Sequence, residues 1–268
     1  MGGDKIHQRF VSLLLAVMVV ASFALTLLTP FAVSSSVHDY IYIVDSISFT
    51  IRTVDTQNNQ QGPIIQGFLE PHSIAASPGG KVVFVADKRG INIIDTASTT
   101  LTGQINGTQG IDFSDLAVSG DATRLFAADK KSPVVYVYGI GEYDPLFQIN
   151  LSPGNNPQYI EVSPDGKVLY VATGSRIETY DVSGGSKTGE IGLGSIHALA
   201  LDINGTYLYA VTGDVNPSTV KVIKTSDMSE AWSVQAGPNA QSICVTPDGK
   251  LVFTANHDDL SASIISTK

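Results

Sequence analysis

Apolar residues along the chain fall in short runs, and residues typical of tight turns separate these runs. In the clearest example Pro164, Asp165 and Gly166 predict a turn, because Pro fixes φ, Asp bonds its own backbone and Gly accepts a positive φ. The run that follows, from Lys167 to Thr173, is rich in β-branched and aromatic residues and predicts a strand. The same pattern starts at Ser77, Ser119, Ser163, Asp202 and Thr246, which gives a repeat of roughly forty residues.

Each repeat predicts four strands. In the repeat that contains Ser77, the expected strands are residues 73–76, 81–86, 90–95 and 102–105. A four-stranded sheet cannot bury both faces alone, and stacking such sheets around an axis solves this and shields most strand edges. We therefore expect an all-β fold, a β-propeller of four-stranded antiparallel blades with about six blades. A seven-bladed ring and an incomplete array remain alternatives.

The repeat is incomplete at both ends of the chain. The first unit predicts strands near residues 40–44, 49–54 and 63–68, and its innermost strand is missing or is supplied by residues 31–34. The last unit begins at Ser242 and stops after its third strand, residues 261–266. Counting back by one repeat length from the outermost strand of the first unit places residues 20–27 at the position of the outermost strand that the last unit lacks. This apolar stretch suits a membrane better than a sheet edge. The sequence does not predict how the ring closes.

The units resemble the YVTN β-propeller repeat, which is named for a motif at the end of the second strand. The chain carries this motif as Tyr170-Val171-Ala172-Thr173, Tyr209-Ala210-Val211-Thr212, Phe253-Thr254-Ala255-Asn256 and Phe126-Ala127-Ala128-Asp129. The resemblance covers roughly residues 37 to 268, since turn, strand and period agree together. It implies a propeller of a kind common in surface and secreted proteins, and a related lactonase family shares this architecture. Propellers host many unrelated functions, so the resemblance assigns none by itself.

The first 34 residues predict export. Residues 11–28 contain no charge and follow a polar segment with Lys5 and Arg9, which is typical of a signal peptide or a hydrophobic membrane helix. Ala32 and Ser34 would allow a cut before Ser35. We therefore divide the chain into a signal peptide or membrane anchor, residues 1–34, and a propeller, residues 35–268. The propeller would lie outside the cell or at its surface, tethered to the membrane by residues 11–28 if the segment is retained.

Charge and cysteine content exclude several partners. The net charge is −9 and the sequence pI is about 4.9, with no Lys/Arg cluster, so we expect no nucleic-acid binding. Cys244 is the single cysteine, which excludes an intrachain disulfide, and we expect it to act as a small apolar side chain. The sequence predicts no metal site and no cofactor. The triplets that begin at Asn106, Asn150 and Asn204 are candidate glycosylation sites in an exporting cell.

Aligning the repeats places five polar residues at the entry to the innermost strands. They are His72, Ser114, Gln158, His197 and Gln241. These residues are expected to form a ring at one mouth of the central channel and are the predicted binding residues, although a channel mouth in contact with water is polar in any propeller. His72 and His197 lie three blades apart, so they should not share one small metal ion. The ring contains no Arg and no Glu.

A second ring is expected at the end of the second strands: Asp45, Asp87, Asp129, Thr173, Thr212 and Asn256. Side chains of these types cap the backbone of the turn that follows, which is the role that we favour. A calcium site built from the three aspartates is the alternative, but adjacent blades should hold their carboxylates too far apart.

The sequence favours a non-catalytic, exported scaffold that binds a protein or a glycan at the cell surface. The chain contains no Gly-x-Ser-x-Gly elbow, no His-Glu-x-x-His and no phosphate-binding loop. The alternative is a lactonase-like hydrolase in which His72 and His197 would polarise an ester and activate water. A docking subunit for a redox partner is a third possibility, without a motif for haem or copper.

Overall fold

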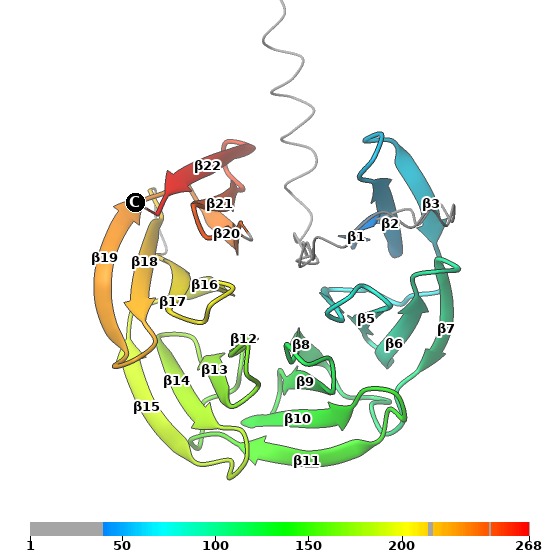
Figure 1. Cartoon of the computed structure of the whole chain (residues 1–268), viewed down its shortest axis with the longest axis horizontal. Coiled ribbons are helices and arrows are strands. Elements are labelled where there is room, and N and C mark those ends of the chain that lie inside the picture. The colour runs from blue at the N-terminus through cyan, green and yellow to red at the C-terminus, as the bar shows by residue number, and fades with distance from the viewer. Residues whose placement is uncertain (1–39, 214–216, 247, 268) are drawn as a thin grey trace, which may run out of the picture.

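A computed structural model describes residues 40–213, 217–246 and 248–267. These residues form six antiparallel sheets that follow one another along the chain (Figure 1). Each sheet is one blade, and the blades are arranged around a central opening. The fold is therefore a six-bladed β-propeller, as the repeat predicted.

Blades 2 to 5 have four strands, and blades 1 and 6 have three. Blade 1 contains β1 (Tyr40–Asp45), β2 (Thr50–Asp55) and β3 (Gln61–Ile65); blade 2 contains β4 (Ser73–Ala76), β5 (Val82–Asp87), β6 (Gly90–Asp95) and β7 (Thr100–Gln104); blade 3 contains β8 (Phe113–Val118), β9 (Arg124–Asp129), β10 (Val134–Gly139) and β11 (Pro145–Asn150). Blade 4 contains β12 (Tyr159–Val162), β13 (Val168–Ala172), β14 (Arg176–Asp181) and β15 (Lys187–Gly192); blade 5 contains β16 (Ile196–Leu201), β17 (Tyr207–Thr212), β18 (Thr219–Lys224) and β19 (Ser229–Gln235); blade 6 contains β20 (Ala240–Val245), β21 (Leu251–Asn256) and β22 (Ser261–Ser266).

The turn between the first two strands of blade 4 has the predicted geometry. The Gly166 amide donates to the Ser163 carbonyl at 2.8 Å, and Gly166 has φ 70°. The Ser163 hydroxyl accepts from the Val168 amide at 2.9 Å and donates to the Asp165 carboxylate at 2.6 Å. Local side-chain bonds therefore fix this hairpin, and the corresponding turns after β4, β8, β16 and β20 close with the same backbone bond.

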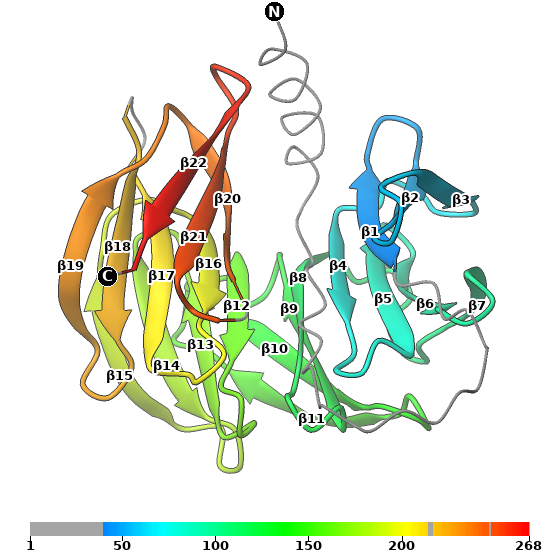
Figure 2. The same ribbon diagram turned by 45° about the horizontal axis from the view of Figure 1, so that its top comes forward.

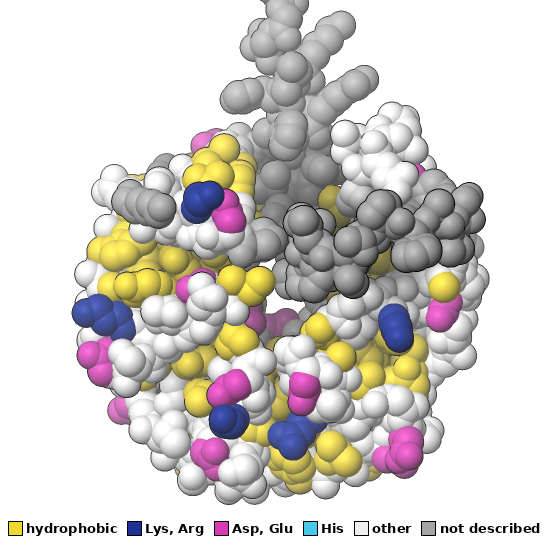
Figure 3. All heavy atoms as spheres, viewed as in Figure 1, with side chains coloured by type: hydrophobic (Ala, Val, Ile, Leu, Met, Phe, Trp, Pro, Cys, Tyr) yellow, Lys and Arg dark blue, Asp and Glu magenta, His cyan; other side chains and the backbone are white. Residues whose placement is uncertain are grey.

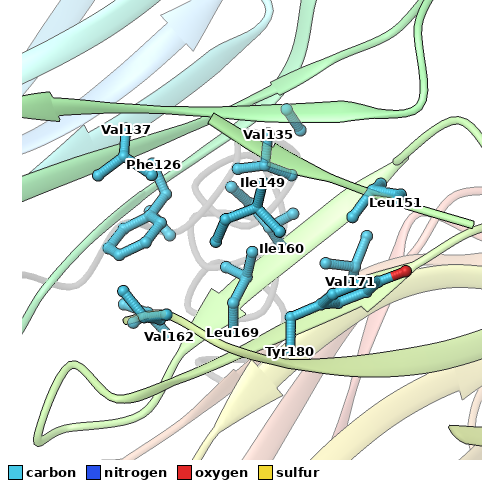
Figure 4. Close-up of a cluster of buried hydrophobic side chains, with 13 residues drawn as sticks. Phe126, Val135, Val137, Ile149, Leu151, Ile160, Val162, Leu169, Val171 and Tyr180 are labelled. Carbon is cyan, nitrogen blue, oxygen red and sulfur yellow. The ribbon is translucent and has the colours of Figure 1, made fainter. Parts of the chain in front are cut away.

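Five clusters of buried apolar side chains hold consecutive blades together. One cluster lies at each interface from blades 1 and 2 to blades 5 and 6. Between blades 3 and 4, Phe126 and Val135 from one sheet pack against Ile160 and Leu169 from the other (Figure 4). These four side chains are at most 3% exposed, so the blade interfaces form the core of the protein.

The interface between blades 6 and 1 differs from the other five. The described residues contain no apolar cluster and no strand pairing that joins these two blades, which stand apart in both ribbon views (Figures 1 and 2). Phe253 of β21 is half-buried, whereas its equivalents Phe84 and Phe126 are fully buried. Ile264 of β22 is 65% exposed. No described residue thus covers the apolar face of blade 6 whose equivalents other blades bury.

Several predictions concern residues 1–39, which lie outside the described residues. They include the hydrophobic helix over residues 11–28, the cut before Ser35 and the strand over residues 31–34. Within residues 40–213, 217–246 and 248–267, no helix is long and apolar enough to cross a membrane.

Candidate functional site

The innermost strands of blades 2 to 6 surround a cavity of about 650 Å³ at the centre of the ring. These strands, β4, β8, β12, β16 and β20, each form one edge of their sheet, so their inner backbone edges have no partner strand among the described residues. Acidic side chains are visible inside the central opening (Figure 3). The cavity is the candidate site because it combines a concave shape with convergent polar groups.

Three residues of the predicted ring line this cavity, and two do not. His72, Ser114 and Gln241 lie in its wall, whereas Gln158 and His197 lie outside the lining. Ser114, His197 and Gln241 each sit where the register of the innermost strand shifts against its neighbour. These register shifts do not decide which residues line the cavity, since Ser114 and Gln241 line it and His197 does not.

His72 and Ser114 connect neighbouring blades. The Nε2 atom of His72 forms a short hydrogen bond with the Phe113 carbonyl of blade 3, and Nδ1 lies 3.0 Å from the Glu70 carbonyl. The Ser114 hydroxyl donates to the Pro157 carbonyl, which precedes blade 4, at 2.7 Å. Both side chains are therefore engaged in holding the ring together.

Asp115 links three blades at the cavity wall. Its Oδ1 atom accepts from the Ser73 hydroxyl of blade 2 at 3.0 Å and from the Leu116 amide at 2.9 Å. Its Oδ2 atom accepts from the Ile160 amide of blade 4 at 2.9 Å. Burial raises the pKa of Asp115 to about 6, and these hydrogen bonds oppose the shift.

Glu161 also lines the cavity but lacks such bonds. Within the described part of the chain no group donates a hydrogen bond to its carboxylate. Burial, and secondarily the charge of Asp115, raises the pKa of Glu161 to about 8. Its side chain keeps some contact with the channel solvent, although protein surrounds it. Glu161 is therefore protonated for most of the time at neutral pH and is the least engaged acidic group at the site.

The three aspartates of the second predicted ring have the structural role that we favoured, whereas the buried Thr173 hydroxyl has no hydrogen-bond partner among the described residues. Asp45 accepts from the Ser48 amide at 2.9 Å, Asp87 from the Arg89 amide at 2.7 Å, and Asp129 from the Lys131 amide at 2.8 Å. Each carboxylate thus caps the turn that follows its strand. No group of three or more His, Cys, Asp or Glu side chains within the described residues could hold a metal ion.

The three candidate glycosylation sites lie on the surface. Asn106, Asn150 and Asn204 are all exposed, which is compatible with modification. The hydroxyl of Thr108, the third residue of the first triplet, is buried and donates to the Ile105 carbonyl at 2.8 Å. Glycosylation at these positions stays a prediction.

Comparison with known proteins supports the fold. No protein-family model matches the chain, and no curated protein matches it. Among solved structures, a chain of Kuenenia stuttgartiensis hydrazine synthase is similar, with a TM-score of 0.63 and 14% sequence identity. The match covers 90% of this chain and 99% of that chain. At this identity the likeness shows a shared propeller architecture and nothing about activity.

Sequence reasoning missed the two carboxyl groups in the cavity. We expected apolar residues after the polar entry to each innermost strand, and Asp115 and Glu161 correct that expectation. A signal for Glu161 was available in the repeat. The position two residues before each turn holds Ala75, Ala117, Glu161, Ala200 and Cys244, so one glutamate interrupts a series of small residues.

Proposed function

We propose that the protein is an exported β-propeller that binds another protein at the cell surface or outside the cell and catalyses no reaction. The observation that carries this proposal is the apolar face of blade 6 at the interface between blades 6 and 1, where Ile264 is 65% exposed and no described residue covers it. Exposed apolar surface at a place where related blades pack against each other is typical of an interaction site.

The chemistry of this interface favours a protein partner over a glycan. The strand β22 contains no charged residue and no proline, and its outer edge has no partner strand in the described part of the chain. Edge strands are usually protected by charge or proline, because unpaired backbone groups accept another strand. We expect an extended, uncharged segment of the partner to pair with β22 and to cover Ile264.

Export rests on the sequence. The uncharged run over residues 11–28 and the resemblance to YVTN repeats both support a surface or secreted protein. Retention of this run would tether the propeller to the outer face of the membrane.

A lactonase-like hydrolase is the second candidate, and the carboxyl pair in the cavity favours it. With pKa values raised to about 6 and about 8, Asp115 and Glu161 lie in the range of a general acid or base at neutral pH. The hydrogen bonds that His72 and Asp115 already make within the protein argue against this function. His72 uses both ring nitrogens in contacts with carbonyl oxygens, and Asp115 already accepts three hydrogen bonds.

Site-specific cross-linking tests the proposal. A photo-cross-linking amino acid replaces Ile264 in the full chain, and the same amino acid at Leu146, which is 54% exposed on β11, serves as the control. We expect a partner protein cross-linked only from position 264, which mass spectrometry identifies. The purified partner should then bind the chain, and Ile264→Lys should weaken this binding about tenfold while Leu146→Lys does not.

Two results would contradict the proposal. A cross-link that forms only within the chain would show that its own residues cover the interface. Saturable hydrolysis in a panel of lactones and esters, lost in Glu161→Gln, would establish the enzyme instead.

A further inference from the structure

We propose that the central cavity binds a compact organic cation with N–H donors, such as a primary ammonium ion, and that the Glu161 carboxylate is its counter-ion. This inference does not depend on the protein-binding function, because it concerns the cavity and not the interface between blades 6 and 1. It rests on the shape of the cavity, on the charge of its wall and on the unpaired carboxylate.

The small residues at the equivalent positions make room beside Glu161. Two of these residues, Ala75 and Ala117, line the same cavity as Glu161. They leave a space of about 650 Å³, whereas one water molecule takes up only about 30 Å³ of the liquid. The glutamate is the one long acidic side chain among these positions, so a ligand of several heavy atoms fits beside its carboxylate.

The charge of the wall selects a cation. Three acidic residues, Asp115, Glu161 and Asp202, line the cavity, and its described lining contains no Lys or Arg. Asp115 and Asp202 both accept hydrogen bonds from neighbouring protein groups, which leaves Glu161 as the carboxylate that lacks a donor among the described residues. An ionised carboxylate in a partly desolvated site is stabilised by a charge-assisted hydrogen bond, which an ammonium N–H supplies.

The wall favours an organic cation over a metal ion. Leu199, Leu201 and Ile243 contribute apolar surface that can contact an alkyl group. The inner edges of β4, β8, β12, β16 and β20 also present backbone carbonyls, which accept further N–H donors. No cluster of three metal-ligating side chains exists within the described residues.

Binding should release a proton. Four titratable groups face Glu161 or share its cavity: Asp115 from β8, Tyr159 from β12, Asp202 after β16 and His72 before β4. Since Glu161 holds a proton at neutral pH and a cation stabilises the ionised form, the carboxyl loses that proton as the ligand enters.

Calorimetric titration of the full chain with n-butylammonium chloride tests this inference. We expect saturable binding at pH 7, a heat that depends on the ionisation enthalpy of the buffer, and tighter binding as the pH rises from about 6 to about 8. Glu161→Gln should weaken binding at least about tenfold, since it removes the ionised partner. The matched control, Glu142→Gln, lies exposed in the turn between β10 and β11 and should bind as the wild type does.

Neutral n-butanol and calcium ions serve as competitors, and neither should displace n-butylammonium from the cavity. Failure of n-butylammonium to bind saturably, equal binding by Glu161→Gln, competition by n-butanol at equal concentration, or displacement by calcium would each overturn the inference. If Glu161→Gln does not fold, as shown by its circular dichroism, the pH dependence and buffer dependence of the wild type decide. Failure here leaves the cross-linking result at Ile264 unaffected, so the two proposals are tested separately.

Discussion

Replacing Glu161 with glutamine should stabilise the propeller at neutral and alkaline pH. The carboxyl has a pKa of about 8 in the folded protein against an ordinary value of 4.5. Between these values the folded state holds a proton that the unfolded state has lost, so folding becomes less favourable as pH rises. Each pH unit in this window costs about 1.4 kcal/mol. By pH 7 the full cost is about 3 kcal/mol, and contact with channel water lowers it to about 1–3 kcal/mol.

Urea unfolding at pH 5, 6.5 and 8 measures this effect, with the fluorescence of Trp232, the only tryptophan, as the signal. We expect the wild type to lose stability from pH 5 to pH 8, partly through Asp115, whose pKa is also raised. Glu161→Gln should show a smaller loss and exceed the wild type at pH 8, whereas Glu142→Gln should follow the wild type. A wild type that gains stability over this range, or a glutamine variant less stable than it at pH 8, would refute the reasoning.

Three further predictions concern the hairpins, the core and export. Gly166→Val should cost about 1–3 kcal/mol, because φ is 70° there, whereas Gly103→Val, in an extended and open position, should cost little; thermal melts compare them. Phe126→Ala should cost about 3–5 kcal/mol in urea unfolding, against under about 1 kcal/mol for the partly exposed Phe147→Ala, and similar costs would contradict the assigned core. Cell fractionation of the full chain should place it outside the cytoplasm, and a soluble cytoplasmic protein with Met1 intact would exclude export by residues 11–28.

The fold was predictable because its signals are local. A turn such as the one at Gly166 depends on a few adjacent residues, and the strand that follows is specified by its own composition. Because each local signal recurs in every repeat, the sequence predicted four strands in each of blades 2 to 5 and one strand fewer in blades 1 and 6. Strand ends differ from expectation by one to three residues, as in β7.

The site was less predictable because it depends on contacts between blades. The bond from the Ile160 amide to Asp115 joins residues 45 positions apart, and no local pattern specifies it. Alignment of repeats found the polar entry residues but not which of them line the cavity, because contacts with the next blade also position these side chains, as for His72 and Ser114.

The five blade interfaces have a consequence for how the protein unfolds. Since each described blade shares a core only with its neighbours, the stability of the molecule approximates a sum of nearest-neighbour terms along an open row. A closed ring would have no weakest place, but a row has two ends. Among the described residues, blades 1 and 6 each share one apolar cluster, whereas blades 2 to 5 each share two. Amide protons of β1 and β22 should therefore exchange with solvent sooner than those of β9 and β13, and any covering of the open interface would slow exchange at both ends together.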